Sequence, residues 1–145
     1  QNKLIVASDP YLYIFNSDTG SIISKTAITS IFKPIVSGKN IFLITKDNLL
    51  VCLNVHTGSV IYSVEINQEI ANYLETKKKS INIKSMAFLN DNLFLFLNNS
   101  FLIQFSVEGK IENIDKLPAK LGSLPIFIKD SIIYLNNKNK LTIIN

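Results

Sequence analysis

Apolar residues along this chain gather in short blocks of strand length, and polar links of a few residues separate the blocks. One example is Leu49–Leu53, which follows the polar link Lys46-Asp47-Asn48. β-Branched and aromatic residues favour pleated, packed strands, and short polar links favour hairpins. Because the blocks are apolar almost without interruption, we expect sheets that are buried on both faces. The pattern predicts an all-β protein.

The same order of blocks recurs along the chain, which indicates an internal repeat. Each unit has two apolar strands, then a turn that ends in Gly, then a further strand. The turn glycines Gly20 and Gly58 are 38 residues apart, and Ile132 follows Leu93 by 39 residues. The repeat length of about 40 residues is typical of one propeller blade.

Two local features of the repeat have physical reasons. Glycine supplies the positive φ that the turns need, and Asn or Asp side chains accept hydrogen bonds from nearby backbone groups. Pro34 and Pro125 each stand before a short apolar run, where the start of a strand tolerates proline. Ser85–Phe88 holds the same place in the third unit. A β-sandwich is the alternative fold, but it does not require these features at fixed offsets.

We therefore expect one partial β-propeller domain over residues 1–145, built of antiparallel four-stranded blades. The expected units are about 3–31, 32–66, 84–117 and 124–145, with an insertion at 67–83. They hold three, four, four and three strands, which is about 3.5 blades. Propellers close with four to eight blades. We expect the C-terminal portion of a larger ring, whose last strand, ending at Asn145, awaits a strand from elsewhere; two chains that close one ring are the alternative.

The insertion at 67–83 is a candidate for function. Ile70, Tyr73 and Leu74 have helical spacing, and Lys77–Lys79 would suit the C-terminus of a helix. We expect a solvated surface loop with one helical turn. The alternative is a partner-binding loop, because scaffold folds carry function on their loops. Its candidate partner-binding residues are Tyr73, Lys77 and Lys78.

The composition indicates no catalytic, cofactor-binding or metal-binding site. The net charge is +4, but all 15 basic residues are lysines. Because base recognition favours Arg, we expect no nucleic-acid partner. Cys52 is the only cysteine and lies in an apolar strand, so we expect a buried, inert thiol. His56 holds the turn position that Asp18 has in the first unit, so we expect a turn residue and not a metal ligand or a catalytic base. Asn98-Asn99-Ser100 matches a glycosylation motif that a turn also explains. No catalytic, cofactor-binding or metal-binding residue is predicted.

The segments Tyr11–Gly20 and Leu49–Gly58 resemble the repeats of PQQ-like propellers. Within that group the chain is most similar to the BamB family of the outer-membrane β-barrel assembly machinery. The resemblance implies an eight-bladed periplasmic lipoprotein scaffold at the outer membrane, without enzyme activity or cofactor. It implies that the partner is the periplasmic part of the central barrel-assembly protein. The Trp usual in these repeats is replaced by Ser24 and Tyr62.

Two other functions are compatible with the repeat. One is a sensor propeller that binds an unknown ligand or protein. The other is a fragment of a PQQ-dependent dehydrogenase, a class that needs a Trp beneath the quinone, a vicinal disulfide and calcium ligands. This chain has no Trp and one Cys. We therefore expect a protein that is not an enzyme.

Overall fold

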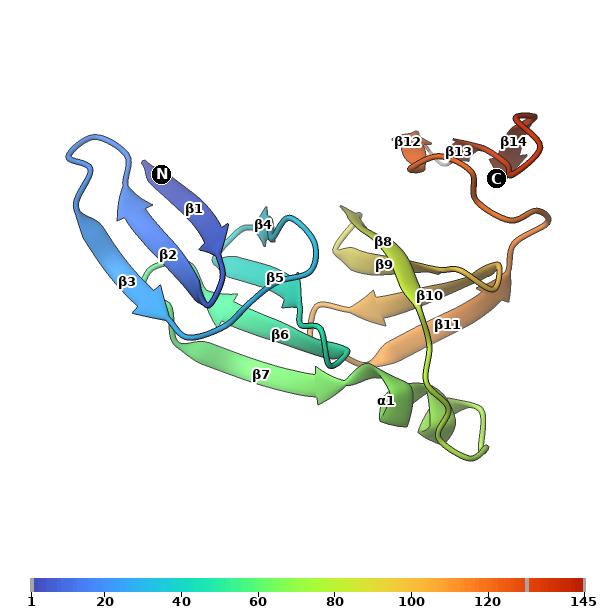
Figure 1. Cartoon of the computed structure of the whole chain (residues 1–145), viewed down its shortest axis with the longest axis horizontal. Helices are drawn as coiled ribbons and strands as arrows, with labels where there is room; N and C mark the ends of the chain where they lie inside the picture. Colours follow the sequence, from blue (N-terminus) through green and yellow to red (C-terminus); the bar gives the residue numbers. More distant parts are fainter. Residues whose placement is uncertain (1, 130, 145) are drawn as a thin grey trace. The chain divides into compact units, whose positions relative to one another are not determined.

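The structure, a computed structural model, describes residues 2–129 and 131–144. Its four antiparallel sheets follow one another along the chain and have three, four, four and three strands (Figure 1). The sheets form two compact units, which divide between Thr76 and Lys77. This arrangement confirms the predicted all-β class and the order of strands. Asn145, the expected end of the last strand, lies outside the described residues.

The first unit contains the first sheet, the second sheet and helix α1. In the first sheet the order is β1 (Lys3–Ser8), β2 (Tyr11–Asn16) and β3 (Ile22–Thr26). The second sheet has the order β4 (Ile35–Ser37), β5 (Asn40–Ile44), β6 (Leu49–Asn54) and β7 (Val60–Glu65). Within each of these two sheets, every strand pairs antiparallel with the strand that follows it in the chain. Both sheets are therefore simple meanders.

The second unit contains the third and fourth sheets, which are meanders as well. In the third sheet the order is β8 (Ile83–Leu89), β9 (Asn92–Leu97), β10 (Phe101–Ser106) and β11 (Ile111–Lys116). The fourth sheet has the order β12 (Ile126–Ile128), β13 (Ser131–Leu135) and β14 (Leu141–Ile144). Pro34 and Pro125 stand directly before β4 and β12, as the sequence predicts.

Strand burial follows the predicted pattern in the middle of the chain. Four successive residues of β5, Ile41 to Ile44, are all 0% exposed, so this strand is buried on both faces. The strand β14 differs, because its exposed residues alternate with half-buried ones and Ile143 is 55% exposed. The expectation of two buried faces is thus correct for the middle strands of the second sheet, whereas one face of the fourth sheet is exposed within the described residues.

The core of the first unit lies between its two sheets. Registry places Ile5 opposite Ile14, on the same face of the first sheet as Leu12. This face packs against the second sheet and forms one apolar cluster with it. The second sheet contributes Ile41, Leu43, Leu49, Val51 and Leu53 to that cluster. In the second unit an equivalent cluster joins Phe96 and Leu102 of the third sheet to Tyr134 of the fourth.

The strand that follows each Gly-containing turn pairs with an irregular register. The register of β2 with β3 shifts between Ile14 and Phe15, and that of β6 with β7 shifts between Cys52 and Leu53. In the third sheet the shift falls between Gln104 and Phe105. A bulge at this place increases the local twist of the strand pair. The repeat therefore includes an element that the sequence pattern did not reveal.

The segments that lead into β4 and β12 also follow one path. The Ile31 amide donates to the Ile44 carbonyl over 2.8 Å, and the Gly122 amide donates to the Leu135 carbonyl over 2.8 Å. Each segment thus runs beside the end of the next sheet's second strand. A Cβ on Gly122 would lie 2.3 Å from the Asn136 carbonyl oxygen. Glycine therefore permits the close approach in the second unit.

Candidate interaction surfaces

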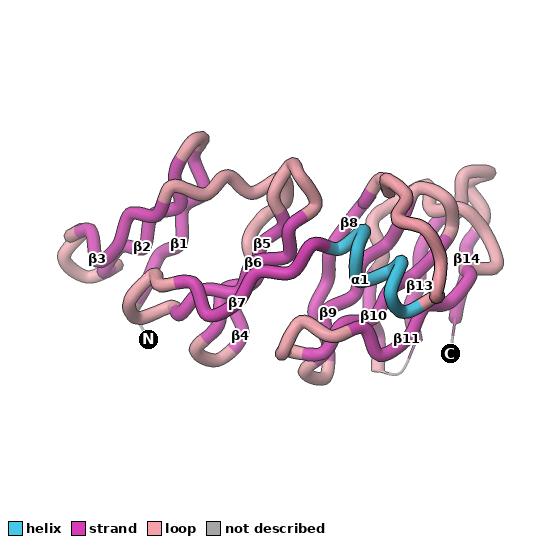
Figure 2. Tube along the Cα trace, turned by 90° about the horizontal axis from the view of Figure 1, so that it is seen from below, coloured by secondary structure: helices cyan, strands magenta, loops and turns pink. Residues whose placement is uncertain are grey.

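Helix α1 (Ile66–Tyr73) carries the first of the predicted partner-binding residues and continues directly from β7 (Figure 2). The Glu65 side chain caps its start, accepting from the amides of Asn67 over 3.2 Å and Gln68 over 3.0 Å. The Ile66 amide donates to the Asn48 carbonyl, which ties the helix to the turn after β5. These bonds stabilise a full helix where the sequence predicted a single turn.

The apolar face of α1 differs from the predicted one. Ile66 and Ala71 are buried, whereas Tyr73 is 45% and Leu74 is 48% exposed. Leu74 is the C-cap, and the last turn has no basic residue. The prediction that Lys77–Lys79 end the helix is wrong, because Glu75 adopts a positive φ of 50° and turns the chain away earlier.

The three predicted partner-binding residues lie in different units. Tyr73 is the last residue of α1, in the first unit. Lys77 and Lys78 follow the boundary and lie exposed in the loop that leads to β8. The structure thus assigns Tyr73 to the first unit and the two lysines to the second.

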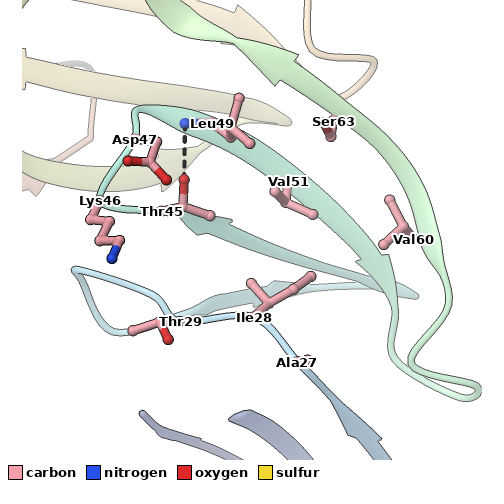
Figure 3. A pocket seen from close by; sticks show the side chains of 10 residues that line it. All are labelled: Ala27, Ile28, Thr29, Thr45, Lys46, Asp47, Leu49, Val51, Val60 and Ser63. Atoms are coloured by element: carbon pink, nitrogen blue, oxygen red, sulfur yellow. Dashed lines mark hydrogen bonds between the residues drawn. The ribbon is translucent and has the colours of Figure 1, made fainter. Parts of the chain in front are cut away.

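A groove in the first unit was not predicted from the sequence. It has a volume of about 430 Å³ and lies between the segment after β3 and the second sheet (Figure 3). Apolar side chains form most of its wall, and three of the polar ones, Thr45, Lys46 and Asp47, stand at the turn after β5. The apolar residues are Ala27, Ile28, Leu49, Val51 and Val60, and the polar ones are Thr29, Thr45, Lys46, Asp47 and Ser63.

Hydrogen bonds hold the polar end of this groove. The Thr45 hydroxyl accepts from the Leu49 amide over 3.2 Å, as the dashed line in Figure 3 shows. The Thr45 amide donates to the Leu49 carbonyl over 3.0 Å. On the opposite wall, the Thr29 hydroxyl donates to Asp9 over 2.8 Å. No sequence motif marks the groove, because only the tertiary structure brings the segment after β3 beside the second sheet.

The two residues with the most reactive side chains are held in structural roles. Cys52 is fully buried, and burial raises the pKa of its thiol to about 11. The thiol is therefore protonated near neutral pH and is a poor nucleophile. His56 lies in the turn after β6, as predicted, and its Nδ1 is 2.6 Å from Lys3 Nζ. That contact joins the turn to the first sheet.

Acidic and metal-ligating side chains are scattered over the structure. Within residues 2–129 and 131–144, no three His, Cys, Asp or Glu side chains gather as metal ligands would. In the same ranges, no helix has the length and apolar character to cross a membrane.

Comparison with known proteins identifies the fold. No family model matches the sequence, and no curated protein matches it. Among solved structures, BamB from Moraxella catarrhalis is similar over 96% of this chain, with 14% identity and a TM-score of 0.69. BBS1N, solved in complex with ARL6DN, matches 99% of the chain with 13% identity and a TM-score of 0.70.

A europium-containing methanol dehydrogenase is also similar, over 80% of this chain, with 11% identity and a TM-score of 0.61. The chain has the β-propeller fold. Its four sheets are blades of such a propeller, and the expected sandwich alternative is set aside. The chain spans 41% of the BamB structure, 43% of BBS1N and 23% of the dehydrogenase.

Proposed function

We propose that this chain is part of a non-enzymatic interaction scaffold of the BamB type, which takes part in outer-membrane β-barrel assembly. The structural likeness to BamB over 96% of the chain supports the proposal. BBS1N, which shares the blade fold, was solved with a bound protein, ARL6DN. The proposed location is the periplasm, at the outer membrane. The proposed partner is the periplasmic part of the central barrel-assembly protein.

The groove between the segment after β3 and the second sheet is the observation that carries this proposal. It exposes an apolar wall in which Val60 is 51% exposed. Apolar pockets with a few polar groups at the mouth are common binding sites for a partner's side chain. Lys46 and Asp47 at its end can orient such a partner. We propose that an apolar side chain of the partner enters the groove beside Val60.

The loop after α1 would provide contacts of its own. Lys77 and Lys78 add positive charge to it, and charges at the rim of an interface act mainly on the rate of association. We therefore expect the double variant Lys77→Glu/Lys78→Glu to slow binding by several-fold at low salt. Tyr73→Ala removes an exposed aromatic ring and reports on α1 separately.

The experiment measures binding of the purified chain to the purified periplasmic part of the central barrel-assembly protein, by biolayer interferometry. Val60→Asp should weaken binding by at least tenfold, because it places a charge in the apolar groove. Ile61→Asp is the matched control, since Ile61 is the next residue of β7, is 52% exposed and does not line the groove. If the unmodified chain does not bind, or if both variants weaken binding equally, the proposal fails.

The likeness to the methanol dehydrogenase favours one alternative function, a fragment of a quinone-dependent enzyme. It predicts that pyrroloquinoline quinone with Ca²⁺ binds the chain and that the quinone absorbance shifts. The scaffold proposal predicts an unchanged spectrum in the same titration. A sensor propeller is the remaining alternative, and tight binding of the barrel-assembly protein would speak against it.

A further inference from the structure

The last strand of each of the first three sheets forms one edge of that sheet. In the second sheet this strand is β7, which pairs with β6 alone among the described strands (Figure 1). An edge strand holds backbone amides and carbonyls that no neighbouring strand uses. Because such groups can pair with a strand of another protein, an unprotected edge is a candidate interaction site.

Ser63 is a residue of β7 whose backbone points away from β6. The Asn54 amide at the end of β6 donates to the Ser59 carbonyl over 2.9 Å, so the backbone of Asn54 faces β7. Backbone groups of successive residues in a strand point alternately to its two sides, so that Val51 of β6 faces away from β7. Registry places Ser63 opposite Val51, and two opposite residues of an antiparallel pair either bond to each other or both point away. The amide and carbonyl of Ser63 therefore point to the open edge, where Ser63 is exposed.

The equivalent position is protected in the other two sheets. Counting five residues from the turn glycine, the equivalents of Ser63 are Lys25 in β3 and Ile114 in β11, and registry gives their backbones the same outward direction. The Ile114 amide donates to the Asn113 side-chain oxygen over 2.9 Å, so a side chain of its own strand occupies it. Lys25 is charged, and a lysine on an edge strand discourages another strand from adding there. Ser63 is uncharged and follows Tyr62, which has no amide oxygen to cap it in this way, so β7 has the least protected of the three edges.

The groove of the first unit adjoins this edge. Ser63 and Val60 both line it, and Figure 3 shows both on β7. In two adjacent strands, the side chains of directly opposite residues lie on the same face, about 5 Å apart. A strand paired with Ser63 therefore places a side chain at the mouth of the groove. Edge and groove thus fit one and the same occupant, an extended segment with an apolar residue opposite Ser63.

We propose that the partner binds by strand addition: an extended segment of the partner pairs with the edge of β7 at Ser63, and one of its apolar side chains enters the groove. This inference rests on the proposed function and names the binding mode of the same site. In this mode, hydrogen bonds between the two main chains supply the affinity, and the pocket for a side chain supplies the specificity. The partner segment is therefore an edge strand or an extended tail, and not a helix.

Ser63→Pro tests strand addition, with biolayer interferometry against the periplasmic part of the central barrel-assembly protein. Proline removes the outward amide, and an edge strand tolerates it where that amide faces solvent. We expect binding to weaken by about tenfold, because the main-chain hydrogen bonds at this residue are lost. Lys25→Pro is the matched control, since it makes the same change at the equivalent position of β3 and should leave binding unchanged. Ser63→Ala keeps the amide and should also bind as the unmodified chain does. Circular dichroism verifies that the variants are folded.

Hydrogen exchange of the Ser63 amide in the unmodified chain is a second measurement, which needs no variant. The amide should exchange rapidly in the free chain and slowly in the complex, whereas exchange of the Ile114 amide should not change. If the chain binds its partner but the Ser63 amide stays unprotected, or if Ser63→Pro binds as tightly as Lys25→Pro, strand addition is overturned and the proposed function stands. If the unmodified chain does not bind at all, both are overturned.

Discussion

Two turns of the first unit have the same local structure and different surroundings. In Asn16–Ser21 and Asn54–Ser59 the Asn side-chain oxygen accepts from the amides two and three residues later. The Thr hydroxyl contacts the Ser hydroxyl over 2.8 Å in one turn and 2.7 Å in the other. Gly20 and Gly58 have φ values of 71° and 72°. The pattern of Asn, Thr, Gly and Ser is therefore sufficient to form this turn.

The neighbouring sheet makes the difference between them. A Cβ on Gly20 would meet nothing within 4 Å, whereas one on Gly58 would lie 1.9 Å from the Ser24 hydroxyl. The Thr26 hydroxyl donates to the Gly58 carbonyl over 3.1 Å, and Lys3 Nζ donates to the Val55 carbonyl over 3.2 Å. The second turn thus joins two blades, while the first is a free turn within its unit.

The largest effect is expected for Gly58→Ala. The new Cβ would need positive φ and would lie 2.6 Å from the Ser24 Cβ, which rotation of the hydroxyl cannot relieve. We expect a loss of about 3 kcal/mol in the free energy of unfolding, from backbone strain and overpacking together. Urea denaturation followed by circular dichroism measures it.

Gly20→Ala is the matched control for that variant. It has the same backbone strain without the steric contact, so we expect a loss of about 1 kcal/mol. Equal losses for the two glycines would show that the packing of Ser24 on Gly58 has no energetic weight.

Replacing the asparagine should lower the free energy of unfolding by the same amount in both turns. Asn16→Ala and Asn54→Ala each remove two hydrogen bonds to backbone amides, and we expect each to cost about 1–2 kcal/mol. Because the bonds have the same geometry in both turns, the two losses should agree. A much larger loss for Asn54→Ala in the same denaturation experiment would mean that local bonding depends on the neighbouring sheet.

Thr26→Val tests the hydrogen bond between the blades. It keeps the shape of the side chain and removes the donor to the Gly58 carbonyl, so we expect a loss of about 1 kcal/mol. Thr19→Val has no bond across the blades to lose. Nuclear magnetic resonance should show a changed carbon chemical shift of the Gly58 carbonyl in Thr26→Val and an unchanged one in Thr19→Val. An unchanged shift in both variants would contradict a role for this bond.

Lys3→Met should have the smallest effect. Methionine keeps the apolar stem and removes the contacts of Nζ with the Val55 carbonyl and with His56 Nδ1. We expect a loss of about 0.5–1 kcal/mol, because the contacts lie at the surface and water replaces them in part. Nuclear magnetic resonance should show shifted His56 ring signals. A stability loss as large as that of Gly58→Ala would reverse the order predicted here.

Most strands and turns of the fold could be predicted from the sequence, whereas the candidate interaction surfaces could be predicted only in part. Strand β6 contains the whole predicted apolar block Leu49–Leu53, because apolar periodicity and turn residues act locally. Helix α1 exceeded the expectation, because a Glu cap and burial of Ile66 stabilise it. The groove beside Val60 has no sequence signal at all, since one wall is the segment after β3 and the other is the second sheet.

The sequence by itself determined the blade: strands from apolar runs, turns from Asn, Thr and Gly, and an inert cysteine from its apolar neighbours. These are local effects, because hydrogen bonds within a turn and the pairing of adjacent strands involve residues close in the chain. The tertiary structure alone decided which of two locally identical turns packs against a neighbouring blade. That choice depends on the stacking of whole sheets, where residues that meet, such as Ser24 and Gly58, are distant in sequence.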